Sequence, residues 1–320
     1  MKKIELHVHL DGSIRPSTVC DILNLDLKYV KENMVVKSNN NDLAEYLSKF
    51  DLPIKVMQTK DNLKRISKEL ALDLKNDGII YAEIRFAPQK HTLKGLNLDD
   101  VISSVLDGLK SVKEIKTNVI LCMMRGDSFQ KNKGVIEICK KYLGNGVVAL
   151  DLAGDEKKYK TSDYKSLFEI AKKEKIPFTI HAGEADNYES VMDAISFGAK
   201  RIGHGINIIE NNDVINEVIK NKVTLEICPT SNVQTKAVES YEKHPIKKLY
   251  EKGVLLTINT DNNTVSNTTL SKEYELLEKH FNFTKEDFYK FNVNAVNASF
   301  ISSKEKEDLI NELKDDFEKN

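Results

Sequence analysis

The chain has 320 residues, and its 48 Lys and Arg nearly balance its 49 Asp and Glu, for a formal net charge of −1. This balance gives no basic excess of the kind that indicates a nucleic-acid or anionic-membrane partner. With 40% hydrophobic and 30% charged residues, the composition is typical of a soluble globular protein, and no apolar run is long enough for a membrane span or a signal peptide.

Eight short segments, most of them apolar and β-branched, recur along the chain and predict strands buried on both faces of a parallel sheet. They are Ile4–His9, Ile79–Phe86, Val119–Met124, Val147–Leu152, Phe178–His181, Arg201–His204, Val223–Cys228 and Val254–Asn259. Amphipathic stretches separate these segments, so the connections are predicted to be right-handed helical crossovers.

Helices are predicted between the strands. The stretch Leu98–Lys116 repeats apolar residues at three- and four-residue spacing. Thr161 and Ser162 are predicted to cap the helix that carries Leu167, and the helix over Ser190–Phe197 is predicted to stop at Gly198. Further helices are predicted in the long interval after the first strand and after the last strand, at Asn41–Phe50, Asp61–Asn76, Leu270–His280, Lys285–Ala295 and Lys304–Phe317.

Eight strand–helix units in one chain of this length predict a (βα)8 TIM barrel, with extra helices inserted after strand 1 and at the C-terminus. A doubly wound sheet would also accept such repeats, but no glycine-rich dinucleotide or P-loop motif follows a strand. No linker or shift in composition divides the chain, so we expect a single domain over residues 1–320.

The cysteines indicate the compartment. They form no C-x-x-C pair and no closely spaced framework, and they are Cys20, Cys122, Cys139 and Cys228. A disulfide scaffold or a cysteine-only zinc site is therefore not expected. The protein is expected to lie in a reducing, cytoplasmic compartment.

The protein is expected to be a monomer or a weak homo-oligomer.

Histidines at strand ends predict a metal site. Period-two alternation puts His7 and His9 on one face of the first strand, a pattern that by itself fits either metal ligation or two ordinary histidines. His181, His204 and Asp261 stand at or next to the ends of three later strands. Because barrel active sites form at the carboxyl ends of strands, these side chains are expected to converge. Three imidazoles and one carboxylate suit Zn²⁺ with room left for water.

A zinc site of this kind indicates hydrolysis. Bound zinc lowers the pKa of its water from about 15.7 towards roughly 7, which makes hydroxide available at neutral pH. Glu184, three residues after His181, suits a proton donor whose pKa is raised by desolvation. His204 is expected to orient or deprotonate the water, and Asp261 to bind the metal and accept a hydrogen bond from the hydroxide.

Motifs spread over almost the whole chain share one pattern. They are ELHVHLDGS at 5–13, KFDLP at 49–53, YAEIRFAP at 81–88, VVALDLAGDE at 147–156, HAGE at 181–184, RIGHG at 201–205, LEICPTSNVQT at 225–235 and TINTD at 257–261. In this order and spacing the chain closely resembles the adenosine deaminases of the metal-dependent amidohydrolase superfamily. The resemblance implies zinc-dependent hydrolytic deamination of adenosine and 2′-deoxyadenosine to inosine and 2′-deoxyinosine, with release of ammonia, in purine salvage.

The resemblance also implies roles for single residues. One Zn²⁺ per subunit would be held by His7, His9, His181 and Asp261. Glu184 would protonate purine N1, and His204 would position the attacking hydroxide.

The substrate of this small-molecule enzyme, a purine nucleoside, would meet four positions. The backbone N–H of Gly154 corresponds to the contact with N3, and His9 and Asp11 to the contacts with the ribose. Phe50 lies in the region that forms a hydrophobic gate in the family. The chain departs from the family at Asn262, where many members carry an Asp that meets N7, although an Asn amide can donate to N7 without being protonated.

Other interpretations remain beside these. Gly154 could serve only the turn after the fourth strand, and Asp11 could cap a helix that begins near Pro16. Glu83 and Arg85 are expected to form a charge network inside the barrel rather than to touch substrate. His91, His244 and His280 receive no chemical role.

Other metal-dependent enzymes fit these residues less well. A metal-dependent phosphoesterase needs more ligands than the sequence offers, and a binuclear amidohydrolase needs a Lys that is missing after the fourth strand. Deaminases with H-x-E and P-C-x-x-C motifs have another fold. The alternatives that stay open are deamination of adenine or another adenine derivative, and a catalytically silent purine-binding relative.

Overall fold

The structure, a computed structural model, describes residues 1–37 and 43–319. Within these residues, eight parallel strands pair in two runs of four, β1 to β4 and β5 to β8. The strands are β1 (Lys3–His9), β2 (Ile79–Phe86), β3 (Lys116–Met124), β4 (Val147–Ala153), β5 (Thr179–Ala182), β6 (Arg201–His204), β7 (Thr224–Ile227) and β8 (Leu255–Ile258). Each predicted strand is therefore present, with ends that differ by at most three residues.

Backbone hydrogen bonds join the two runs into a closed barrel. Between β4 and β5, the N–H of Leu150 donates to the carbonyl of Pro177 at 2.9 Å. Beyond β8, the N–H of Asp261 donates to the carbonyl of His7 at 2.8 Å, and the N–H of His9 donates to the carbonyl of Asp261 at 2.7 Å. The (βα)8 barrel is confirmed, and its second seam places Asp261 directly beside the histidines of β1.

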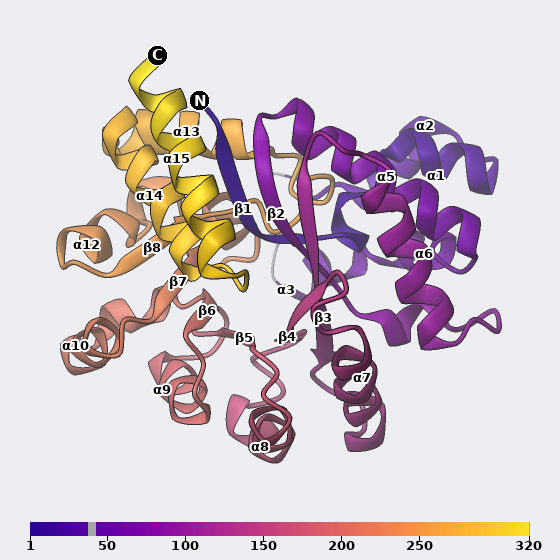
Figure 1. Ribbon diagram of the computed structural model, residues 1–320, viewed down its shortest axis with the longest axis horizontal. Helices are drawn as coiled ribbons and strands as arrows, with labels where there is room; N and C mark the ends of the chain where they lie inside the picture. The colour runs from indigo at the N-terminus through magenta and orange to yellow at the C-terminus, as the bar shows by residue number, and fades with distance from the viewer. Residues whose placement is uncertain (38–42, 320) are drawn as a thin grey trace.

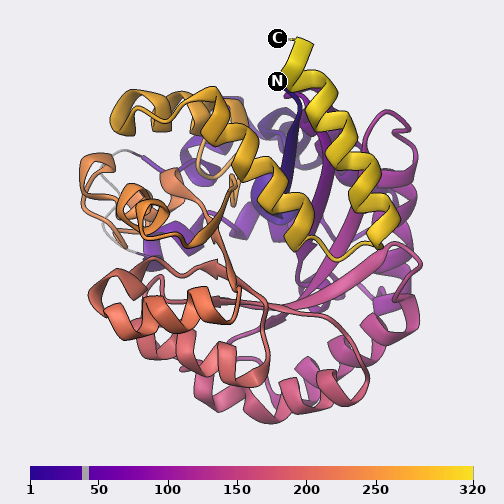
Figure 2. The ribbon, with the colours of Figure 1, turned by 60° about the vertical axis from the view of Figure 1, so that its left-hand side comes forward.

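Helices surround the barrel, as Figures 1 and 2 show. Between β1 and β2 lie α1 (Pro16–Leu23), α2 (Leu27–Met34), α3 (Leu43–Ser48), α4 (Asp51–Val56) and α5 (Lys60–Asn76). The following units carry α6 (Leu98–Lys110), α7 (Phe129–Tyr142), α8 (Lys165–Lys173), α9 (Tyr188–Phe197), α10 (Asn212–Lys220), α11 (Pro229–Gln234) and α12 (Ile246–Glu251). After β8 come α13 (Leu270–Phe281), α14 (Lys285–Ala298) and α15 (Ser303–Lys319). The extra helices after strand 1 and at the C-terminus are thus both present.

Two predicted helix ends need correction. The helix predicted over Leu98–Lys116 ends at Lys110, because Lys116 already pairs with β2 as the first residue of β3. Of the predicted helix Asn41–Phe50, residues 41 and 42 lie outside the described residues, and α3 ends at Ser48.

The predicted cap of α8 is also wrong. A short 3-10 turn covers Thr161–Tyr164, and α8 begins after it without a side-chain cap. The hydroxyl of Thr161 lies 2.7 Å from that of Ser190 instead, so its hydrogen bond joins the 3-10 turn to α9. The stop at Gly198 is confirmed, because this residue follows α9 with a φ of 103°, a conformation that favours glycine.

The two C-terminal helices cover the amino end of the barrel, where both termini lie close together (Figures 1 and 2). A cluster of buried apolar side chains joins α14 and α15 to the first two strands, and its members are Ile4, Leu6, Tyr81, Ala295, Val296, Leu309 and Leu313. The side chain of Asn292 also accepts a hydrogen bond from the backbone N–H of Ile4 at 2.8 Å. With this end closed, the carboxyl ends of the strands are left for a functional site.

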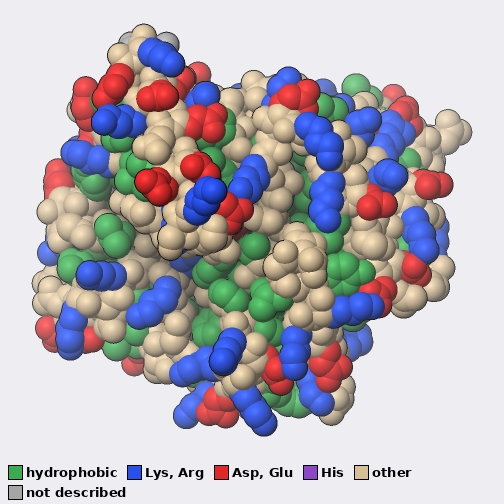
Figure 3. Space-filling model, in the orientation of Figure 1, with side chains coloured by type: hydrophobic (Ala, Val, Ile, Leu, Met, Phe, Trp, Pro, Cys, Tyr) green, Lys and Arg blue, Asp and Glu red, His purple; other side chains and the backbone are tan. Residues whose placement is uncertain are grey.

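The surface carries both signs of charge. Figure 3 shows Lys and Arg side chains interspersed with Asp and Glu over the face that it draws, as expected from the balanced composition. None of the helices in the described ranges combines the length and the apolar character needed to cross a bilayer.

Candidate active site

Four side chains from the first, fifth and last strands meet at the carboxyl end of the barrel. They are His7 and His9 at the end of β1, His181 in β5 and Asp261 after β8, and their ligating atoms all lie within 4.8 Å of one another. The Nε2 atoms of His9 and His181 are 3.4 Å apart, and Asp261 Oδ1 lies 3.3 Å from His9 Nε2. The structure therefore brings together all four residues for which the sequence suggested metal ligation.

This donor set fits a zinc ion. Nε2 of His7 is buried, lies 3.4 Å from Asp261 Oδ1 and has no hydrogen-bond partner among the described residues, although a buried polar atom normally has one. A cation between the three imidazoles and the carboxylate would satisfy this nitrogen and offset the buried negative charge. Histidine nitrogens and carboxylate oxygens are both ligands that zinc binds in proteins.

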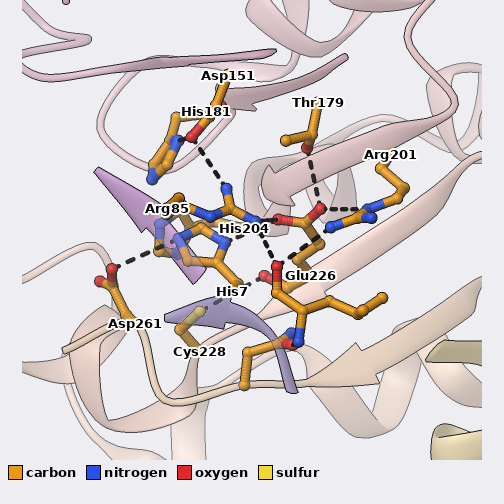
Figure 4. Close-up of polar contacts among 12 residues, drawn as sticks. His7, Arg85, Asp151, Thr179, His181, Arg201, His204, Glu226, Cys228 and Asp261 are labelled. Atoms are coloured by element: carbon orange, nitrogen blue, oxygen red, sulfur yellow. Dashed lines mark hydrogen bonds and ion pairs between the residues drawn. The ribbon is translucent and has the colours of Figure 1, made fainter. Parts of the chain in front are cut away.

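Carboxylates stand behind two of the imidazoles, as Figure 4 shows. Nδ1 of His7 lies 2.8 Å from Oε2 of Glu226, and Nδ1 of His181 lies 2.9 Å from Oδ2 of Asp151. Acceptors at Nδ1 keep a proton there and direct the lone pair of Nε2 towards the centre of the cluster. Glu226 and Asp151 therefore orient two of the candidate ligands.

Two buried arginines connect these carboxylates. Arg85 donates to Asp151 at 3.0 Å and to Glu226 at 2.7 Å, and Arg201 donates to Glu226 at 2.7 Å and pairs with Glu83. The predicted charge network of Glu83 and Arg85 inside the barrel is confirmed, and it proves to include the carboxylates behind the histidines. Interior charges are stable here because each one is paired and hydrogen-bonded.

Glu184 lies beside this cluster in a buried pocket. Its Oε1 accepts a hydrogen bond from the Thr235 hydroxyl at 3.0 Å, and its Oε2 lies 3.6 Å from Nε2 of His204. Burial, together with the charge of Asp261, raises the pKa of Glu184 from 4.5 to about 7. A carboxyl group with such a pKa can hold and donate a proton at neutral pH.

His204 is buried at the end of β6 with a φ of 63°, in the left-handed region that L residues rarely adopt. Burial lowers the pKa of its imidazole from 6.5 to about 4, so the ring is neutral at pH 7. Asp261 has a similar φ of 60°. Its Oδ2 accepts a hydrogen bond from the hydroxyl of Ser231 at 2.5 Å. Left-handed backbone at two residues that line the same recess is typical of a functional site.

A cavity of about 310 Å³ opens next to the cluster, and the residues of its wall include His9, Asp11, Phe50 and Gly154. A smaller recess shares His9, Phe50 and Gly154 with it and reaches Glu184, His204, Asp261 and Asn262. The residues for which the sequence suggested substrate contacts thus lie on one continuous wall. Mixed apolar and polar lining of this size suits a small organic molecule.

Comparison with known proteins decides the family. The family model for adenosine deaminase matches residues 2–316. An adenosine deaminase of Clostridium botulinum is 44% identical over 98% of both chains. The chain belongs to the adenosine deaminase family. It is accordingly a hydrolase that acts on carbon–nitrogen bonds of cyclic amidines, and a deaminase of adenosine-type substrates.

Two solved structures place the fold among deaminase barrels. An N6-mAMP deaminase of Arabidopsis superposes with a TM-score of 0.89 at 26% identity, over 100% of this chain and 98% of that one. A Burkholderia amidohydrolase solved with bound zinc superposes with a TM-score of 0.88 at 18% identity, over 100% of this chain and 93% of that one. The zinc belongs to that structure; in the present chain, His7, His9, His181 and Asp261 form a group that could hold a metal ion.

Within this adenosine deaminase family member, Asp11 does not cap a helix. The helix α1 begins at Pro16 after Arg15, and no side chain caps it. The carboxyl of Asp11 is buried on the cavity wall instead, where burial raises its pKa to about 6. Within the part of the chain that the structure describes, its Oδ1 has no hydrogen-bond partner. Gly154 has a φ of 106° and also lines the cavity, so the turn and the cavity wall both depend on it.

Several residues around the site were not identified from the sequence. Tyr46 in α3 lines the recess beside Asn262, and its hydroxyl accepts a hydrogen bond from Nδ2 of Asn262 at 2.8 Å. Asn232 and His244 lie behind His204, although the sequence assigned no role to His244. For Asp151 and Glu226 the sequence did hold a signal, since each is the single charged residue of its strand.

Proposed function

We propose that the chain is a zinc-dependent adenosine deaminase that hydrolyses adenosine and 2′-deoxyadenosine to inosine and 2′-deoxyinosine plus ammonia. The observation that carries the proposal is the position of Glu184. A buried carboxyl group with a pKa of about 7 lies on the same recess as a three-histidine, one-carboxylate donor set. A proton donor beside such a donor set is what hydrolytic removal of an aromatic amino group requires.

The metal would be one zinc ion per subunit, held by His7, His9, His181 and Asp261. When bound, zinc supplies a Lewis acid that allows water to act as a nucleophile near neutral pH. The carboxylates of Asp151 and Glu226 hold two of the imidazoles in the orientation that this requires.

The remaining steps belong to side chains of the barrel. Glu184 holds a proton that it gives to purine N1, which makes C6 more electrophilic. One proton of the attacking water would go to the amino group, which leaves as ammonia, and the other would restore the proton of Glu184. His204 is neutral and orients the attacking water. Both side chains are buried, so bulk water does not compete for these protons.

The substrate would lie along the cavity wall. The backbone N–H of Gly154 would donate to N3, Asn262 would donate to N7, and His9 and Asp11 would meet the ribose, with the Asp11 carboxylate accepting from the 5′-hydroxyl. Phe50, half-buried on the same wall, would cover the apolar face of the base.

A nucleoside fits this wall better than a nucleotide. Lys90 and Arg125 also line the cavity, but Lys90 pairs with Asp127, and Arg125 donates to backbone carbonyls. Asp11 and Asp155 line the same cavity, and their charge opposes a 5′-phosphate. Adenosine is therefore preferred over AMP and its N6-methyl derivative in this proposal.

We further propose that residues 1–320 act as one domain, as a monomer or weak homo-oligomer, in purine salvage in the cytoplasm. Balanced charge and cysteines without close spacing support the soluble, reducing setting.

The test is an activity and metal assay on the purified chain. Metal analysis is combined with the ultraviolet change that accompanies loss of the 6-amino group, for adenosine, 2′-deoxyadenosine, adenine, AMP and N6-methyl-AMP, before and after chelation. We expect zinc in the protein, the highest kcat/KM for the two nucleosides, and loss of activity on chelation.

Glu184→Gln is the matched variant for this assay, because it keeps the size and the hydrogen bond from Thr235 but cannot donate a carboxyl proton. Its kcat should fall by about 10²–10⁴ while zinc content and folding are retained. A folded, zinc-replete wild-type protein without any spectral change on adenosine would overturn the proposal and favour a purine-binding relative. Highest activity on adenine or a nucleotide would replace the proposed substrate.

A further inference from the structure

A chain of three buried hydrogen bonds ends on the ring of His204. It begins at the backbone N–H of Ile246, which donates to Nδ1 of His244 at 3.2 Å. Nε2 of His244 lies 3.2 Å from Oδ1 of Asn232, and Nδ2 of Asn232 lies 3.0 Å from Nδ1 of His204. The three side chains are at most 3% exposed, so water does not replace any of these partners.

The donor and acceptor of each of these three hydrogen bonds follow from the first one, in which the backbone N–H of Ile246 donates to His244. A backbone N–H can only donate, so Nδ1 of His244 is an acceptor, and the proton of the neutral ring is on Nε2. Burial and the nearby His204 lower the pKa of His244 to about 3, which keeps the ring neutral. Nε2–H of His244 then donates to Oδ1 of Asn232, and this fixes which end of the amide faces His204.

The orientation of the Asn232 amide determines the hydrogen bond that His204 makes. With Oδ1 taken by His244, Asn232 presents its Nδ2 protons to His204, whose Nδ1 must accept. The single proton of the neutral His204 ring is therefore on Nε2, the nitrogen that lies 3.6 Å from Glu184. Nδ2 of Asn232 also lies 3.5 Å from Oε1 of Glu184, so the same amide is close to both groups.

We propose that His244 and Asn232 are positioning residues that hold His204 in the tautomer with its proton on Nε2, so that His204 donates a hydrogen bond to the attacking water. This inference deepens the proposed function and rests on the role assigned there to His204. Neither residue touches the substrate; each acts through the next member of the chain. The wrong tautomer of a catalytic histidine is costly, about 10⁴ in kcat in the serine protease triad.

Nuclear magnetic resonance can determine directly which ring nitrogen of His204 carries the proton. Zinc-loaded protein labelled with ¹⁵N-histidine is examined by two-bond proton–nitrogen correlation, and the His204 signals are assigned by their loss in His204→Gln. We expect a neutral His204 ring with the proton on Nε2 in the wild-type protein. A proton on Nδ1 would overturn the inference, whatever the activity of the enzyme.

Two variants test the two positioning residues. In Asn232→Asp both carboxylate oxygens only accept, so Nδ1 of His204 must carry a proton and donate, and the neutral ring with its proton on Nε2 alone should be lost. We expect kcat for adenosine to fall about 100-fold, with KM changed less than about threefold. His244→Phe removes the donor that fixes the amide and should give a mixture of tautomers and a smaller fall in kcat.

His91→Phe is the control, because it replaces another fully buried imidazole, one that takes no part in these three hydrogen bonds. It should leave the His204 tautomer and kcat unchanged. A neutral His204 ring without a proton on Nδ1, together with a normal kcat, in Asn232→Asp would overturn the inference. If Asn232→Asp fails to fold, the wild-type tautomer and His244→Phe still decide the question. Absence of deamination by the wild-type protein would refute the proposed function but leave the tautomer measurement valid.

Discussion

The carboxylate of Glu156 binds the backbone of the loop that carries Glu184. Oε2 of Glu156 accepts a hydrogen bond from the N–H of Glu184 at 3.0 Å and from that of Ala185 at 2.9 Å, and Oε1 accepts from the N–H of Gly183 at 2.6 Å. Although burial opposes ionisation, the charge of Arg125 and these hydrogen bonds hold the pKa of Glu156 below its ordinary value. A charged carboxylate after β4 therefore fixes the loop after β5.

Replacing this anchor should displace the proposed proton donor. Glu156→Gln keeps the size of the side chain, but its amide NH₂ meets backbone N–H donors and leaves at least one of them without an acceptor. We expect kcat for adenosine to fall by about 10–100-fold, because small displacements of a catalytic group are costly, while zinc content stays the same. Steady-state kinetics and metal analysis measure both effects.

The control for this anchor is Glu169→Gln on α8, where the side chain is exposed and contacts no loop of the site. It should behave as wild type. Equal kcat values for Glu156→Gln and Glu169→Gln would show that Glu156 does not position Glu184.

Tyr46 should determine how well the proposed N7 contact is made. Nδ2 of Asn262 donates one proton to the Tyr46 hydroxyl, and Oδ1 lies so close to Gly12 that a Cβ there would be 1.7 Å away. Only the second Nδ2 proton is then free for a purine acceptor. Tyr46→Phe should lower kcat/KM for adenosine about tenfold and leave that for 7-deazaadenosine, which has no acceptor at this position, nearly unchanged.

The comparison includes Tyr250→Phe, which removes a hydroxyl that donates to Asp287 far from the cavity. This variant should leave kcat/KM unchanged for both adenosine and 7-deazaadenosine. A fall of the same size for adenosine and 7-deazaadenosine in Tyr46→Phe would mean that the hydroxyl serves packing alone.

Metal affinity should depend on the carboxylate behind His181. Asp151→Asn replaces an acceptor of Nδ1 by an amide, and it also removes one of the charges that pair with Arg85. We expect zinc affinity to fall by about 10–100-fold, as measured by competition with a chromogenic chelator. Asp163→Asn, on an exposed turn before α8, is the control. Unchanged zinc affinity in Asp151→Asn would argue against His181 as a ligand.

A buried carboxyl group on α13 should make stability depend on pH. Burial raises the pKa of Glu273 from 4.5 to about 7, and its side chain accepts hydrogen bonds from Thr230 and Thr268. Because the folded chain binds this proton more tightly than the unfolded chain, the contribution of Glu273 to the unfolding free energy decreases as pH rises from about 4.5 to about 7. The expected decrease is on the order of 3 kcal/mol, at about 1.36 kcal/mol per pKa unit.

Urea unfolding at several pH values measures this dependence. In Glu273→Gln the contribution should be absent, so the variant should gain stability relative to wild type as pH rises through this window. Glu275→Gln, an exposed position on the same helix, should follow wild type. Parallel curves for wild type and Glu273→Gln would contradict the prediction.

The fold could be predicted from the sequence because its strands are nearly uniform in character. Each of the eight apolar segments is a strand, since a β-branched run between amphipathic stretches has few alternatives to a buried parallel strand. Helix ends were less predictable. The helix α6 stops at Lys110 although apolar residues continue at Val112 and Ile115, because the following strand needs its own register against β2.

Some residues of the site could likewise be predicted from the sequence, and others could not. The metal-binding candidates could be found from the sequence because they stand at strand ends, which meet at one rim of any closed parallel barrel. Asp151, Glu156 and Glu226 could not be assigned, because their partners are 25 to 219 residues away. A carboxylate in a strand looks the same in sequence whether it pairs with an arginine or supports a histidine.

By itself, the sequence determined the order of strands and helices and the residue types that the barrel rim would carry, because both follow from local patterns and from chain order. Only the tertiary structure decided how those residues act. Which nitrogen of His204 carries its proton depends on Asn232, and the loop of Glu184 depends on Glu156. Orientation and proton affinity depend on distance and burial in three dimensions, and these are fixed only when segments far apart in the chain pack together.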